Sequence, residues 1–175
     1  MRGGGSITLK YEMDRAKLLL AMNTPDPIGA IIRIQTELDE VLKHTIKSMV
    51  SPPIPRLQYA SERIECLVAN GLPRLRVAPA SIINTVRNNF AHNNKQAFKP
   101  RDVNKLQQAV TKLYGGLNFE NFVFIHRKKD SDIELRYADM DHKQRFCLLG
   151  FAAIAAVAAI EIEFSPGTFK RLNPN

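Results

Sequence analysis

The sequence predicts an all-α protein, a compact bundle of five or six helices with one short β-hairpin near residues 122–137. Hydrophobic residues recur at helical spacing over most of the chain. Pro, Gly and Asn fall between these runs, where helices end. Short apolar or alternating runs, typical of strands, are confined to residues 122–125 and 133–137.

The first two helices are predicted over residues 13–22 and from Asp26 to Met49. Asp26 is suited to cap the second helix, and Ser51-Pro52-Pro53 ends it. Its hydrophobic face consists of Ile28, Ile31, Ile32, Leu38, Val41, Leu42, Ile46 and Met49. The opposite face is predicted to be solvated and carries Arg33, Glu37, Asp39, Glu40, Lys43 and Lys47.

The third and fourth helices are separated by Gly71 and Pro73. The third is predicted over residues 55–70, with Gly71 in the left-handed position that ends many helices. A loop containing Arg74 and Arg76 follows, and Pro79 is suited to the first turn of the fourth helix. The hydrophobic positions of that helix are Ile82, Ile83, Val86 and Phe90.

The last two helices are predicted over residues 100–113 and 141–163. Pro100 and Asp102 start the fifth helix and Gly115-Gly116 ends it. The sixth is rich in alanine, so a neighbouring helix or a second copy of the chain can approach closely, and we expect a homodimer. Residues 13–175 are expected to form a single domain after a flexible tail over residues 1–12.

The composition favours an acidic partner and a reducing compartment. The 25 Lys and Arg residues exceed the 17 Asp and Glu residues, which gives a net charge of +8. Such a balance favours phosphate backbones, although it also serves solubility. Cys66 and Cys147 lie in apolar helical patterns and are expected to be buried free thiols, which places the protein in the cytoplasm.

Several classes of site and location are not expected. The charge-free segment 146–160 is shorter than the roughly 20 residues of a membrane span. The four histidines and two cysteines lack the paired spacings of zinc ligands. There is no phosphate-binding loop ending in Lys-Ser or Lys-Thr. We therefore expect no membrane association, metal or cofactor.

The segment Arg87-Asn88-Asn89-Phe90-Ala91-His92 is the most informative part of the sequence. Asn88 and His92 lie four residues apart, so they can form a hydrogen bond on one helix face. Arg87 would point about 140° away from His92 on an unbroken helix. The two side chains converge only if the helix ends near Ala91 or if a second subunit contributes its own copy. Alternatively, Arg87 forms a surface ion pair and His92 only ends the helix.

This segment resembles the signature of the HEPN superfamily of helical nucleic-acid-associated proteins. The chain is most similar to the mannitol operon repressor family, over residues 28–49, 66–72, 87–92 and 97–113. The superfamily resemblance implies a metal-independent endoribonuclease, commonly with a site assembled across a dimer. His92 would then be the general base, Arg87 would bind the scissile phosphate, and Asn88 would orient one of them.

The mannitol repressor resemblance implies instead a non-catalytic regulator that binds a protein or nucleic acid. Nucleic acid, RNA rather than DNA, is the expected partner, with a regulatory protein as the alternative. If nucleic acid binds, it is expected to be held mainly through phosphates with little sequence discrimination. Six basic residues bracket the signature and are the candidate nucleic-acid-binding residues: Arg74, Arg76, Lys95, Lys99, Arg101 and Lys105.

Overall fold

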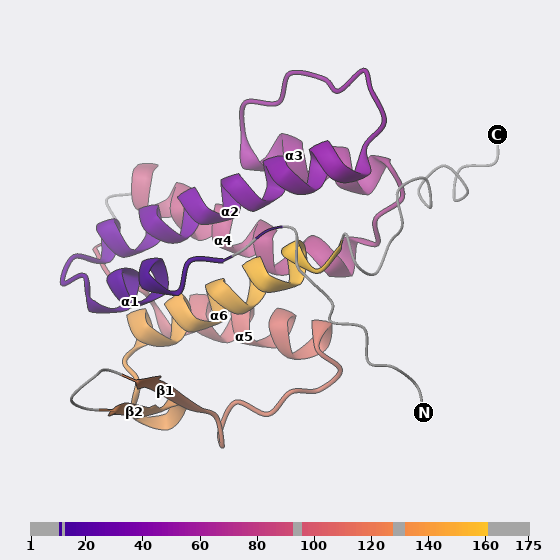
Figure 1. Cartoon of the computed structure of the whole chain (residues 1–175). Coiled ribbons are helices and arrows are strands. Elements are labelled where there is room, and N and C mark those ends of the chain that lie inside the picture. The colour runs from indigo at the N-terminus through magenta and orange to yellow at the C-terminus, as the bar shows by residue number, and fades with distance from the viewer. Residues whose placement is uncertain (1–10, 12, 93–95, 128–131, 161–175) are drawn as a thin grey trace, which may run out of the picture.

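The computed structural model describes residues 11, 13–92, 96–127 and 132–160, and in these it contains six α-helices and one antiparallel hairpin (Figure 1). The predicted fold class is therefore confirmed. The helices are α1 (Arg15–Asn23), α2 (Pro27–Met49), α3 (Ala60–Ala69), α4 (Arg74–His92), α5 (Pro100–Leu113) and α6 (His142–Ala158). The strands are β1 (Val123–Arg127) and β2 (Asp132–Arg136), in register Val123 with Arg136, and a short 3₁₀ helix covers Tyr137–Asp139.

Helix α6 lies in the middle of the molecule, in contact with α1, α2, α4 and α5 (Figure 1). Its small residues permit this close packing: a Cβ atom at Gly150 would lie 3.0 Å from Cγ2 of Ile34 on α2. Most of α6 is buried within one chain, so its alanines serve neighbouring helices of the same chain. None of the helices described is both long and apolar enough to cross a membrane.

Most helix ends follow the predicted signals. Asp26 accepts hydrogen bonds from the backbone N–H groups of Ile28 and Gly29, at 3.0 and 2.7 Å, and so caps α2. Gly71, which follows α3, has φ of 98°, the left-handed conformation that glycine adopts without steric cost. Gly115 and Gly116, which follow the end of α5, adopt the same left-handed conformation.

Two predicted boundaries are wrong. Residues 55–59 are not helical, because the buried guanidinium of Arg63 binds the carbonyls of Leu57 and Gln58, both at 3.0 Å, and holds them outside the helix. In contrast, Arg74 and Arg76 belong to the first turn of α4 and not to a loop. Pro79 lies inside α4, although its nitrogen cannot donate the backbone hydrogen bond of an α-helix. The stabilisation from burying Val77, Pro79 and Ala80 in the core outweighs the loss of that hydrogen bond.

The predicted solvated face of α2 contains a buried carboxylate. The side chain of Glu37 is 1% exposed and accepts hydrogen bonds from Tyr11 Oη at 2.8 Å and Lys17 Nζ at 2.6 Å. Lys17 also binds Glu40, at 3.1 Å. Helix α1 covers this part of α2, so Glu37 is compensated by partners from outside its own helix.

The stability that this cluster provides should decline at alkaline pH. Burial, followed by the hydrogen bond to Glu37, raises the pKa of Tyr11, and the hydrogen bond to Glu37 raises the pKa of Lys17. Both pKa values are higher in the folded than in the unfolded chain. The contribution is therefore complete below about pH 10 and is lost as the pH rises further.

We expect the stability advantage of the parent chain over Tyr11→Phe to shrink above about pH 10. Urea unfolding of both proteins between about pH 7 and 11 measures this difference. If the difference in the free energy of unfolding stays constant over this range, the pKa of Tyr11 is not raised in the folded chain, which would contradict the prediction.

Both cysteines are free. Cys147 is buried in α6, as predicted, and burial raises its pKa to about 12, so this thiol is unreactive in the folded chain. Cys66 is only half-buried.

Candidate nucleic-acid interface

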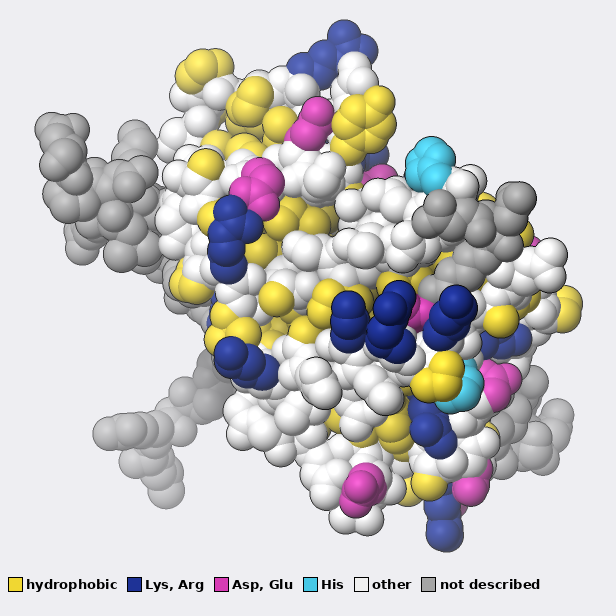
Figure 2. Space-filling model, turned by 180° about the vertical axis from the view of Figure 1, so that it is seen from behind, with side chains coloured by type: hydrophobic (Ala, Val, Ile, Leu, Met, Phe, Trp, Pro, Cys, Tyr) yellow, Lys and Arg dark blue, Asp and Glu magenta, His cyan; other side chains and the backbone are white. Residues whose placement is uncertain are grey.

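A groove runs between α4 and α5. It consists of two adjoining cavities, of about 260 and about 520 Å³, which share Ile82 and Lys105 as lining residues. Both helices contribute along their length, from Arg74 and Lys112 at one end to Asn89 and Arg101 at the other. On the face seen in Figure 2, Lys and Arg side chains follow one another beside hydrophobic side chains.

The α5 wall of the groove is basic. Arg101, Lys105, Gln108 and Lys112 are exposed and follow each other at intervals of four, three and four residues, which places them on one helix face. In the part of the chain that the structure describes, no carboxylate forms a salt bridge with Arg101, Lys105 or Lys112. These three cations are therefore available to an anionic ligand.

The α5 row begins at a capped helix end. Asp102 lines the groove, but its side chain is buried and accepts a hydrogen bond from the backbone N–H of Lys99, at 3.1 Å. Pro100 occupies the first turn, where its missing N–H has no cost. The carboxylate of Asp102 therefore caps the start of α5 and is not exposed to a ligand in the groove.

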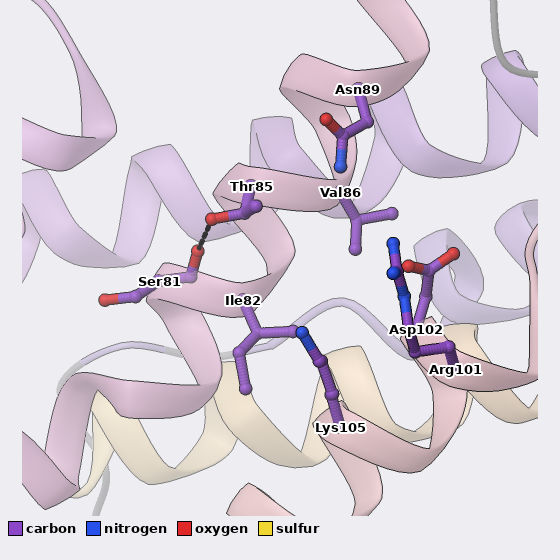
Figure 3. A pocket seen from close by; sticks show the side chains of 8 residues that line it. All are labelled: Ser81, Ile82, Thr85, Val86, Asn89, Arg101, Asp102 and Lys105. Carbon is purple, nitrogen blue, oxygen red and sulfur yellow. Dashed lines mark hydrogen bonds between the residues drawn. The ribbon is translucent and has the colours of Figure 1, made fainter.

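The α4 wall combines apolar and polar groups (Figure 3). Ile82 and Val86 point toward Lys105 and Arg101 on α5. Asn89 lies next to Val86, and the Ser81 and Thr85 hydroxyls point to the side of α4 away from α5. The Ser81 and Thr85 hydroxyls donate to the carbonyls of Val77 and Ser81, at 3.2 and 2.9 Å. Their oxygen atoms can still accept a hydrogen bond from a ligand.

Arg74 lies at the far end of the α4 wall and is paired with Glu65. Its two guanidinium nitrogens donate to the two carboxylate oxygens, each at 2.9 Å. Both side chains are more than half exposed, so exchanging this partner for a phosphate costs little.

Three of the six predicted nucleic-acid-binding residues line the groove: Arg74, Arg101 and Lys105. Lys99 is exposed at the residue before α5, next to the groove. Arg76 is half-buried on α4 and lines neither cavity, and Lys95 lies outside the described residues. Lys112 also lines the groove but was not among the predicted residues, although its spacing from Lys105 and Gln108 places it on the same helix face.

The predicted catalytic residues do not converge within one chain. Helix α4 continues to His92, so Arg87 and His92, five positions apart, point about 140° from each other. Arg87 Nη1 donates to Asn88 Oδ1, at 3.2 Å. Among the described residues no hydrogen bond joins Asn88 to His92, contrary to our expectation. His92 is exposed at the end of the helix.

The signature segment is divided among three surroundings. Phe90 is buried, and its ring packs against Phe98, with centroids 5.0 Å apart. Asn89 lines the groove, whereas Arg87 and His92 do not. The residues of α4 that line the groove and the predicted catalytic pair therefore lie on different faces of that helix.

The described residues contain no group of three or more His, Cys, Asp or Glu side chains that could hold a metal ion. No protein-family model, curated protein or solved structure matches this chain.

Proposed function

We propose that this protein binds nucleic acid by its phosphate backbone, in the groove between α4 and α5. The row of Arg101, Lys105 and Lys112 on one face of α5 carries this proposal. Phosphate contacts of Lys and Arg release counterions, and the net charge of +8 favours the encounter. Such binding is sufficient for a non-catalytic regulator of the mannitol operon repressor type.

Replacing Arg101, Lys105 and Lys112 together by glutamine should weaken binding roughly 10- to 100-fold near physiological salt. The slope of the logarithm of the association constant against the logarithm of salt concentration should become shallower by up to about 2, because up to three phosphate contacts to the single strand are lost. Fluorescence anisotropy with a labelled 2′-O-methyl RNA strand, which cannot be cut through its 2′-oxygen, measures both quantities.

The matched control replaces Arg33, Lys43 and Lys47 on α2 by glutamine. These residues are exposed and line neither cavity, and their loss changes the net charge by the same amount. Equal weakening in the two triple variants would show that only the net charge attracts the ligand. An α5 variant that binds as well as the parent would overturn the proposal.

A second function, metal-independent RNA cleavage, rests on the presence of Arg87, Asn88 and His92 in the signature segment, although the Arg87 and His92 side chains diverge within one chain. Arg87 is held by Asn88, and His92 is exposed at the end of the same helix. His92 of one subunit would take the proton of the RNA 2′-hydroxyl, whose oxygen then attacks phosphorus. Arg87 of the other subunit would stabilise the charge on the phosphate. The 5′-oxygen leaves and takes a proton from solvent, which yields a 2′,3′-cyclic phosphate and a 5′-hydroxyl.

This second function requires a homodimer, because the two side chains diverge on one helix. In a two-fold dimer each of two equivalent sites would take Arg87 from one subunit and His92 from the other. Light scattering at micromolar concentration tests the dimer independently of activity.

A further inference from the structure

The two walls of the groove differ in chemistry. The α5 wall presents the exposed cations Arg101, Lys105 and Lys112. The facing α4 wall presents apolar surface from Leu75, Ala78 and Ile82, and Leu75 is 40% exposed. Arg74, the cation at the end of this wall, is paired with Glu65. A ligand that fills this groove must therefore be anionic along one edge and largely apolar along the other.

A single nucleic-acid strand has these two edges. Its phosphates follow one side, and its unstacked bases present flat faces on the other. A duplex carries phosphates on both outer strands and keeps its base faces inside the stack, so it offers nothing apolar to α4. We propose that the groove binds a single-stranded segment, with phosphates along α5 and bases over the apolar residues of α4. This inference rests on the proposed function.

The length of the α5 row suits a short nucleic-acid strand. Arg101 and Lys112 are about 16 Å apart along the α5 axis, a length that spans a short strand. Ser81, Thr85 and Asn89 of α4 also line the end of the groove near Arg101.

The test compares a 2′-O-methyl uridine strand of about 12 nucleotides, within the usual site sizes, with a 2′-O-methyl duplex of the same length. We expect the parent chain to bind the single strand about tenfold more tightly than the duplex. Leu75→Asn and Ile82→Asn should each weaken single-strand binding several-fold without changing its salt dependence, because neither removes a charge. Lys105→Gln should lower the salt slope by about 0.7.

Ile32→Asn is the matched control, since Ile32 is 52% exposed on α2 and lines neither cavity. Thermal unfolding shows whether each variant is folded, and the exposed Leu75 keeps the test valid if Ile82→Asn is unstable. Equal affinity for the duplex, or unchanged binding by Leu75→Asn, would overturn the single-strand inference and leave the proposed function standing. Preference for poly-glutamate over both nucleic acids, or no binding at all, would overturn both.

Discussion

Replacing Phe146 by alanine is expected to lower the free energy of unfolding by about 3–5 kcal/mol. Phe146 is fully buried on α6, and its ring stacks on Phe98 with centroids 4.7 Å apart. Phe98 in turn packs against Phe90 near the end of α4. Truncation leaves a cavity where α4, α6 and the segment before α5 meet. Urea unfolding followed by circular dichroism measures the loss.

The matched control is Phe124→Ala in the hairpin. Phe124 is only half-buried at the edge of the core, so its removal should cost less than the removal of Phe146. A loss below about 1 kcal/mol in Phe146→Ala would contradict the central position of this ring, because such values are typical of surface substitutions.

If the second function holds, the parent chain should cut RNA in the presence of EDTA, and His92→Ala should slow cleavage by about 10²- to 10⁴-fold. Arg87→Ala should slow it by about 10²- to 10³-fold, because the phosphate loses a charged donor. Folding should be unaffected, since His92 is exposed and Arg87 is only half-buried. A gel assay with labelled RNA measures cleavage.

His142→Ala, which removes an exposed histidine of α6, is the matched control and should cut like the parent. Mixing Arg87→Ala with His92→Ala should restore about a quarter of the parent activity. Half of the randomly formed dimers are then mixed, and one of their two sites is intact. No recovery on mixing would contradict a shared site. No cleavage by a parent chain that still binds RNA would leave the regulatory function.

Periodicity and capping signals were sufficient to predict the helices, because they depend on neighbours along the chain. Hydrophobic spacing located all six helices and the hairpin, and Asp26 and Gly71 were placed correctly. The errors arose where distant residues intervene. Arg63 holds residues 57 and 58 outside α3, and Lys17 and Tyr11 make a buried position acceptable for Glu37.

The candidate site was predictable only in part, for the same reason. Charge and motif identified Arg74, Arg101 and Lys105, which line the groove, together with Arg76, which does not. Sequence alone could not show that α4 begins at Arg74 and packs along α5, which brings Ile82 opposite Lys105.

The sequence by itself determined the helical class, the basic charge and the composition of the segment from Arg87 to His92. Each of these follows from the residues present and their local spacing. Only the tertiary structure decided that α4 continues through His92, that Asn89 faces the groove, and that one wall is basic while the other is largely apolar. These features depend on which helix packs against which. That arrangement results from burying the hydrophobic faces of the helices in one core, with α1, α2, α4 and α5 packed around α6 and α3 against α2 and α4. It is a property of the whole chain and not of any one segment.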